Sequence, residues 1–215
     1  MLDAFRMHNR FAERVQPDRM CVLLVDCQAR LVERYDPERL ALSDNLLGLA
    51  RLARAFSMPV VLATLRDGRY GELLPALAEE TPAASRVERA AGDFWHDAAS
   101  VDAVKAQGRR DLLVAGIDPE GGLAGLALGG REAGFLVRAV ADASAGGTPS
   151  SQRIGAARMS AAGIEVTSWV AIMAEFSSAT RSKPQAAASA ALNDSLARYQ
   201  AGAAAWSEER PIVSA

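Results

Sequence analysis

The sequence is poor in the side chains on which most nucleophilic and metal centres depend. It has 2 cysteines and 2 histidines among its 215 residues. Cys21 and Cys27 fall on one predicted extended segment, roughly 20 Å apart at about 3.3 Å per residue, which is too far for a disulfide. His8 falls in a predicted amphipathic helix, which leaves His96 as the candidate base of a histidine triad. Because no histidine, cysteine or carboxylate cluster has metal-ligand spacing, we expect neither a metal nor another cofactor.

The sequence also lacks a strong charge of one sign and a long apolar run. Its formal net charge is −2, which offers no basic surface for nucleic acid. The longest apolar runs are five or six residues, far below the 18 or so needed to cross a bilayer. The first residues include the early acid Asp3 and no apolar core of a signal peptide. These features predict a cytoplasmic protein whose partner is a small molecule, not a nucleic acid or a membrane.

What the sequence has instead is a regular alternation of short apolar runs with helical segments. Residues 20–26 form a continuous apolar run that ends in an acid, which is typical of a strand buried on both faces of a parallel sheet. Asp36-Pro37 provides an N-cap and an N1 proline for a helix that continues to Met58. Further strands are predicted over 60–63, 86–88, 112–115, 136–140 and 164–167, with helices near 72–79, 97–107, 121–133 and 150–162.

This alternation predicts the fold class. Parallel strands need a crossover connection, and that connection is right-handed in nearly all proteins. We therefore predict a three-layer α/β/α sandwich with a mostly parallel six-stranded sheet, doubly wound like a Rossmann fold. The first and fourth strands should be adjacent and central, with Asp26 and Gly122 at the same edge of the sheet. Ligands of such sheets bind at the point where the strand order reverses.

The C-terminal part differs in composition from the rest. Residues 177–215 are rich in serine and alanine, with a helical segment near 186–204. We predict one α/β domain over 1–176 and a helical appendage over 177–215. Leu192, Tyr199 and Trp206 would cover either their own domain or a neighbouring subunit, and so much apolar surface favours a homo-oligomer.

Polar residues follow three of the predicted strands, where the ligand of an open α/β sheet binds. Asp26 ends the first strand, and Arg89 follows the third, where its charge would keep the carboxylate ionised. After the fourth strand, Asp118 begins a helix-start sequence whose free N–H groups suit an oxyanion. Each feature alone also has an ordinary structural explanation: a turn former, a solvated arginine or glycines that serve packing.

Several segments together resemble a known family. They are 22–28, 89–95, 103–109, 113–117, 141–144 and 159–163, with Trp169. Over roughly residues 20–176 the chain is similar to the isochorismatase-like, or cysteine hydrolase, superfamily and within it to the YcaC-like branch. The resemblance implies an active site at the strand ends, where an aspartate, a lysine or arginine and a cysteine attack a small amide.

The resemblance assigns roles to individual residues. It implies that Asp26 is the family's aspartate and that Arg89 is its basic residue. The family reads roughly Gly-Ile-x-Thr-x-Val-Cys after the fourth strand, so Gly122 stands at the cysteine position. The residues predicted to bind substrate are Gln28, Trp95, Asp118 and Pro119.

The glycine leaves two functions open. Without a thiolate no covalent acyl-enzyme forms, but isochorismatases look similar in carrying glycine there, and they cleave an enol ether by protonation from the aspartic acid and addition of water. One hypothesis is therefore a small-molecule hydrolase in which Asp26 is acid or base, Arg89 orients it, and the N–H groups of Asp118 and Gly122 hold an oxyanion. The other is a degenerate family member that acts as a ligand-binding or assembly protein. A dinucleotide site at Gly121-Gly122-x-x-Gly125 is disfavoured, since the acid expected at the next strand end is represented only by Asp142 nearby.

Overall fold

The computed structural model describes residues 15–35, 42–90, 93–118, 121–179 and 192–201. Across these residues a six-stranded sheet runs in the order β3-β2-β1-β4-β5-β6, and every adjacent pair is parallel. The strands are β1 (Met20–Val25), β2 (Val60–Leu65), β3 (Ser85–Arg89), β4 (Asp111–Ile117), β5 (Leu136–Ala145) and β6 (Glu165–Thr167). The predicted fold class and the central β1–β4 pair are confirmed.

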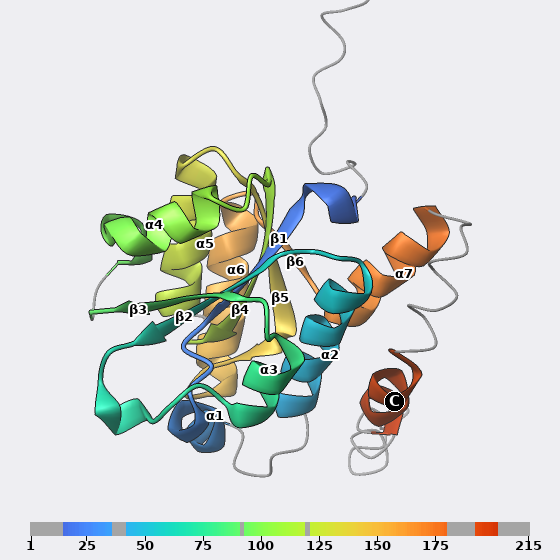
Figure 1. The fold of residues 1–215 in the computed structure, drawn as a ribbon, viewed down its shortest axis with the longest axis horizontal. Helices are drawn as coiled ribbons and strands as arrows, with labels where there is room; N and C mark the ends of the chain where they lie inside the picture. The colour runs from blue at the N-terminus through green and yellow to red at the C-terminus, as the bar shows by residue number, and fades with distance from the viewer. Residues whose placement is uncertain (1–14, 36–41, 91–92, 119–120, 180–191, 202–215) are drawn as a thin grey trace, which may run out of the picture.

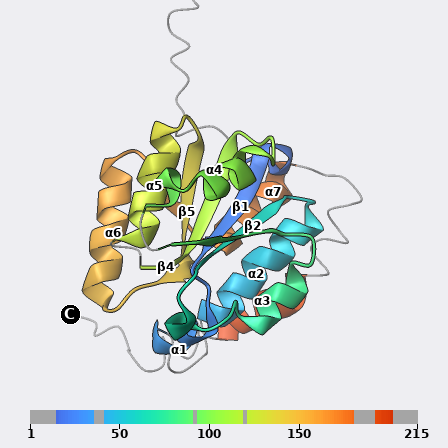
Figure 2. The same cartoon turned by 60° about the vertical axis from the view of Figure 1, so that its left-hand side comes forward.

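Helices cover both faces of the sheet (Figures 1 and 2). One face carries α1 (Ala29–Tyr35), α2 (Leu42–Ala55), α3 (Pro75–Glu80) and α7 (Trp169–Ala179). The other carries α4 (Ala98–Lys105), α5 (Gly122–Glu132) and α6 (Pro149–Ala161). Short 3-10 helices are η3 (Pro17–Arg19), η4 (Gly68–Tyr70) and η5 (Phe94–His96). None of the helices in the described part of the chain is long and apolar enough to span a membrane.

The central strand β1 is buried along its whole length, which explains its uninterrupted apolar sequence. Its alternate side chains enter two separate cores, with Met20, Val22 and Leu24 on the α2 face and Cys21, Leu23 and Val25 on the α5 face. The sheet winds outward from β1 through β2 to β3 and from β4 through β5 to β6, so the direction reverses between β1 and β4. The carboxyl ends of these two strands therefore flank the crevice in which ligands of this fold class bind.

A close approach of the backbone joins the two central strands next to that crevice. Gly116 of β4 pairs with Val25 of β1 and has a φ of 138°. A Cβ atom on Gly116 would lie 2.0 Å from the carbonyl oxygen of Val25. Only glycine fits this position, and this fit sets the distance between the ends of β1 and β4.

Three parts of the fold differ from the sequence-based expectation or extend it. Helix α1 was not predicted, and β5 continues five residues beyond the predicted end at Val140, to Ala145. The register of the β4–β5 pair shifts between Val114↔Ala139 and Gly116↔Ser144, so one intervening residue of β4 faces four of β5, residues 140–143. The predicted helix start at Asp36-Pro37 lies outside the described residues.

The C-terminal segment packs on its own chain where it is described. Residues 192–201 are helical, and Leu192 is buried in the core on the α2 face. The Arg51 guanidinium donates a 2.8 Å hydrogen bond to the hydroxyl of Ser195. Tyr199 meets the Trp169 ring edge-on, with centroids 6.0 Å apart. Trp206 lies outside the described residues.

The irregular part of β5, where its register with β4 shifts, connects α2 and α7 to the sheet through a buried polar network. Oδ1 of Asp142 accepts a hydrogen bond from the N–H of Trp169 at 3.1 Å, and its carbonyl accepts one from Nδ2 of Asn45 at 2.9 Å. The indole N–H of Trp169 donates to Oδ1 of Asn45 at 2.9 Å. Burial raises the pKa of Asp142 from 3.8 to about 6, although hydrogen bonds such as that from Trp169 oppose the shift. Asp142 thus connects β5 to α2 and α7.

The raised pKa of Asp142 makes the stability of the fold dependent on pH. A carboxyl with a raised folded-state pKa contributes fully below pH 3.8, and this contribution is lost as the pH rises to about 6. We expect Asp142→Asn, whose side-chain oxygen still accepts from Trp169, to unfold with a free energy about 1–3 kcal/mol larger than the parent's at pH 7. The measurement is denaturant unfolding of both proteins at pH 4 and pH 7. An advantage of the variant that does not shrink at pH 4 would contradict this assignment.

Candidate functional site

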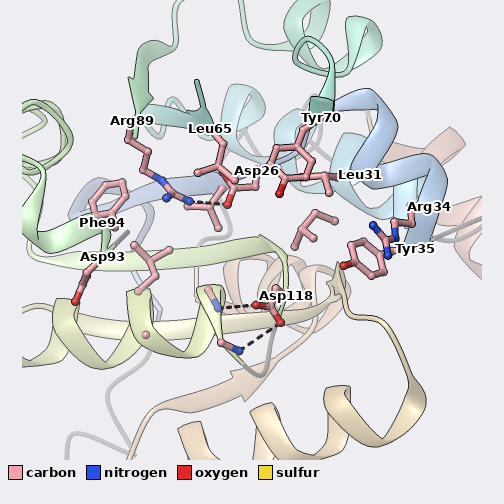
Figure 3. A pocket seen from close by; sticks show the side chains of 16 residues that line it. Asp26, Leu31, Arg34, Tyr35, Leu65, Tyr70, Arg89, Asp93, Phe94 and Asp118 are labelled. Carbon is pink, nitrogen blue, oxygen red and sulfur yellow. Dashed lines mark hydrogen bonds and ion pairs between the residues drawn. The ribbon is translucent and has the colours of Figure 1, made fainter. Parts of the chain in front are cut away.

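A cavity of about 540 Å³ opens at the carboxyl ends of β1 and β4 (Figure 3). It is lined by Val25, Asp26, Leu31, Arg34, Tyr35, Leu65, Tyr70, Arg89, Asp93, Phe94, Ile117, Asp118, Gly121, Gly122, Gly125 and Leu126. Its walls combine aliphatic and aromatic side chains with a few charged groups, which is the usual composition of a small-molecule site. Within the described ranges, no three His, Cys, Asp or Glu side chains gather so that they could hold a metal ion.

Asp26 and Arg89 form a buried ion pair at one wall of the cavity. Nη2 of Arg89 lies 2.5 Å from Oδ2 of Asp26, and the two residues are 7% and 8% exposed, respectively. Asp26 follows β1 with a φ of 55°, and its N–H donates to the carbonyl of Ala63 on β2 at 2.8 Å. Its second oxygen, Oδ1, is buried and has no hydrogen-bond partner among the described residues. The sequence-based placement of this pair at one site is thus matched by direct contact.

The pKa of Asp26 shifts in the direction opposite to the expectation. The sequence suggested that Arg89 would keep the carboxylate ionised, but burial raises the pKa of Asp26 above its usual value. The Arg89 charge and hydrogen bond oppose this shift, and the nearby Asp118 carboxylate adds to it. The desolvation was invisible in the sequence, because it depends on how completely the loops close over the end of β1. A raised pKa makes this carboxyl group better suited to general acid catalysis than an ordinary aspartate.

The loop after β4 satisfies its own backbone groups with the side chain of Asp118. Oδ2 of Asp118 accepts a hydrogen bond from the N–H of Gly122 at 3.1 Å, and Oδ1 accepts one from Gly121 at 3.4 Å. The N–H of Asp118 itself donates to the carbonyl of Ala145 at 2.9 Å. The two N–H groups predicted to hold an oxyanion, those of Asp118 and Gly122, are therefore both engaged within the protein.

Gly122 begins α5 at the cavity wall, in a place that can accept a side chain. A Cβ atom on Gly122 would lie 3.5 Å from the carbonyl oxygen of Ile117 and 3.8 Å from Oδ2 of Asp118, which are ordinary van der Waals contacts. A small side chain at this position would therefore fit without strain.

Neither cysteine reaches the cavity. Cys21 and Cys27 are both 1% exposed or less and pack in the cores on opposite faces of the sheet. Burial raises the pKa of Cys21 to about 12 and raises that of Cys27 even further. Thiols in this state are poor nucleophiles, because the thiolate is the reactive form.

Gln28 and Trp95, which were predicted to bind substrate, do not line the cavity. Gln28 is buried, and its Nε2 donates to the carbonyls of Leu65 at 3.1 Å and Gly71 at 2.7 Å. Its Oε1 accepts from the N–H of Leu65 at 3.0 Å, so all of these bonds hold the segment after β2. Pro119 lies outside the described residues.

Trp95 packs behind the cavity wall. Its indole N–H donates to the carbonyl of Leu126 at 2.7 Å, and its ring lies over the glycines of α5. Phe94, the preceding residue, lines the cavity in its place. The side chain of His96 is 87% exposed and pairs with Asp93 at 3.3 Å. His96 itself does not line the cavity, whereas its partner Asp93 does.

Several cavity residues were missed by the sequence reasoning. Leu31, Arg34 and Tyr35 come from α1, and Tyr70 comes from η4. The signal that could have found α1 is the helical spacing of its buried residues Leu31 and Val32 with the cavity residue Tyr35.

Comparison with known proteins connects this geometry to a family. The isochorismatase domain family matches residues 20–171. The chain belongs to the isochorismatase family. It is 33% identical over 167 residues to the probable hydrolase YcaC of Escherichia coli, with 75% of this chain and 79% of that protein covered.

Two solved structures of YcaC proteins extend the match from sequence to fold. The E. coli protein, described as an octameric hydrolase of unknown specificity, aligns with a TM-score of 0.79 at 30% identity, covering 91% of this chain and 97% of that one. YcaC of Pseudomonas aeruginosa, solved with hexane-2,5-diol and covalent acrylamide, aligns with a TM-score of 0.78 at 31% identity, covering 89% and 97%. The chain is thus a member of the YcaC-like branch of the isochorismatase family.

The packing of Trp95 on α5 gives a test of how the cavity wall is held. A Cβ atom on Gly129 would lie 2.2 Å from Cδ1 of Trp95, whereas nothing lies within 4 Å of one on Gly125. We expect Gly129→Ala to destabilise the protein by about 1–3 kcal/mol through overpacking. Gly125→Ala, in the same helix, should stabilise it by roughly 0.5–1 kcal/mol through helix propensity. Thermal unfolding checks both, and an equal effect of the two alanines would contradict the packing described.

Proposed function

We propose that this isochorismatase-family chain is a hydrolase of a small molecule, in which Asp26 donates the proton and water replaces the family's thiol as nucleophile. The observation that carries the proposal is the buried Asp26–Arg89 pair, 2.5 Å apart in the wall of a 540 Å³ cavity that has glycine at the expected cysteine position. The relatives named YcaC are described as hydrolases, which supports the reaction class.

The chemistry follows from the missing sulfur. Gly122 offers no nucleophile, and the two thiols of the chain are buried in the cores on either face of the sheet. A covalent thioester is therefore not available, and the proposed reaction uses acid–base catalysis with water.

Asp26 is suited to the acid role because its raised pKa favours the protonated form at the end of β1. Proton transfer to the leaving atom generates a carboxylate, and the Arg89 guanidinium stabilises that charge where it forms. Arg89 also fixes the orientation of the carboxyl group, because its guanidinium holds Oδ2 of Asp26 in the wall of the cavity.

A specific observation favours the alternative of a ligand-binding or assembly protein. The N–H groups of Asp118 and Gly122, which would hold an oxyanion, already donate to Ala145 and to the Asp118 carboxylate. A chain that has lost the reaction would retain the cavity and the fold while its anion site is closed in this way.

The two candidates are separated by substitution of the acid. A panel of small amides, esters and enol ethers is assayed with the parent and with Asp26→Asn, which keeps the shape of the side chain. We expect turnover by the parent and a loss of about 10²–10⁴-fold in kcat for the variant, since that is the usual contribution of positioned proton transfer.

The controls are Cys21→Ser and Cys27→Ser, which should leave kcat unchanged. Turnover that survives Asp26→Asn would refute the acid role. A parent that turns over no member of the panel while it binds some of them would support the binding alternative. Hydrolysis that appears only in Gly122→Cys would show that a sulfur nucleophile is needed after all.

We also propose that the chain forms a homo-oligomer. The E. coli relative is octameric, and that relative and this chain align over 97% and 91% of their lengths. We expect light scattering at micromolar concentration to give a mass that is a multiple of the 22.7 kDa chain. A monomeric mass would overturn this proposal.

A further inference from the structure

We propose that Asp118 is a second catalytic carboxylate, which takes the proton from the attacking water while Asp26 protonates the leaving group. This inference rests on the proposed hydrolase function and names the base that it requires. The two aspartates follow the neighbouring strands β1 and β4 and line the same cavity. In Figure 3 they lie on opposite sides of that cavity.

The backbone holds both aspartates in the same uncommon conformation. Asp26 has a φ of 55° and Asp118 a φ of 62°, in the left-handed region that costs non-glycine residues about 1–3 kcal/mol. Such strain persists where the surrounding structure fixes it, and it clusters at active sites and ligand clamps. Here it turns two carboxyl groups from adjacent strand ends into one cavity.

The space around Asp118 is cleared for its carboxylate. The resemblance implies that family members carry valine and cysteine at the positions that match 121 and 122 of this chain, which has glycine at both. A Cβ atom on Gly121 would lie 2.7 Å from Oδ2 of Asp118, too close for any larger residue without a shift. One on Gly122 would lie 3.8 Å from the same oxygen. The carboxylate thus stands beside the position that the family's nucleophile would occupy.

The opposite wall carries Asp26, a buried carboxyl group that lines the same cavity. Asp26 is 8% exposed, and its Oδ1 has no hydrogen-bond partner in the described part of the chain. Asp118 is exposed and accepts two backbone N–H groups, whereas Asp26 is buried in the wall. Pairs of carboxyl groups in such different surroundings divide into an acid and a base in other enzymes.

The proposed step balances in atoms and charge. The oxygen of a water molecule attacks the electrophilic carbon of the substrate, and its proton passes to the Asp118 carboxylate. The bond from that carbon to the leaving atom breaks, and the leaving atom takes the proton of Asp26. The products are R–OH and the protonated leaving group, after which Asp118 loses its proton to solvent and Asp26 regains one.

A purely structural role would make Asp118 a cap for the N-terminus of α5. Three variants separate the two roles. Asp118→Asn retains an oxygen that can accept from Gly122, Asp118→Ala removes both functions, and Asp118→Glu keeps a carboxylate. Asp97→Asn is the matched control, because Asp97 caps α4 through Ser100 and does not line the cavity.

With the panel substrates that the parent turns over, we expect Asp118→Asn to lower kcat by about 10²–10⁴-fold while KM and Tm stay near the parent values. Asp118→Glu should retain part of the activity. Added formate should restore turnover to Asp118→Ala, because a free carboxylate can occupy the vacated space, and it should not help Asp26→Asn. Asp97→Asn should turn over like the parent.

A single turnover in ¹⁸O-labelled water identifies the attacking atom. Direct attack by water places the label in the product of the first turnover. Unlabelled product from that turnover would make Asp118 a nucleophile and overturn its role as base. Parent-like kcat in Asp118→Asn, or no rescue by formate, would overturn the proposal and leave the hydrolase function standing. A parent without turnover on the panel would instead refute the hydrolase function, and this proposal with it.

Discussion

The arrangement of the site depends on one buried ion pair that reaches across the sheet. Arg89 ends β3, the edge strand, and Asp26 ends β1, with β2 between them. The 2.5 Å contact therefore fixes the ends of three strands relative to one another. Two charges this deeply buried lose several kcal/mol of hydration each, and removing one partner of such a pair typically costs about 3–5 kcal/mol. Positioning an edge strand does not require a buried ion pair. The pair also positions the Asp26 carboxyl group in the wall of the cavity.

Much of the fold could be predicted because parallel sheets impose a simple pattern on the sequence. The uninterrupted apolar run of β1 reflects burial on both faces, and all six of its residues are buried. The right-handedness of crossovers limits the possible topologies, and the predicted adjacency of the first and fourth strands is confirmed. Helix α1 escaped prediction because it is short, so the helical spacing of Leu31, Val32 and Tyr35 extends over little more than one turn. The irregular register of β5 left no pattern in the sequence, since it depends on how β5 pairs with β4 near Gly116.

The sequence predicted which residues lie near the strand ends, but it did not predict which of their side chains point into the cavity. Asp26, Arg89, Asp118 and Gly122 all line the cavity, because each follows the end of a strand or begins the helix after it. Gln28 and Trp95 are neighbours of site residues in sequence, yet one bonds to the loop after β2 and the other lies on α5. Whether a side chain near a strand end points into the crevice depends on turns such as the left-handed φ of Asp26, and no periodicity encodes these.

The state of charge at the site could not be predicted either, because it depends on depth and on neighbours far apart in the chain. Asp118 contributes to the raised pKa of Asp26 through space, although the two residues are separated by more than half of the described domain. The same carboxylate explains why glycine at 121 and 122 belongs with aspartate at 118. A thiolate at position 122 would be repelled by the nearby Asp118 carboxylate, and such a like charge raises the pKa of a thiol. A cysteine at 122 would therefore fit sterically but would ionise less readily beside Asp118, so this loop favours a carboxylate over a thiolate at the cavity wall.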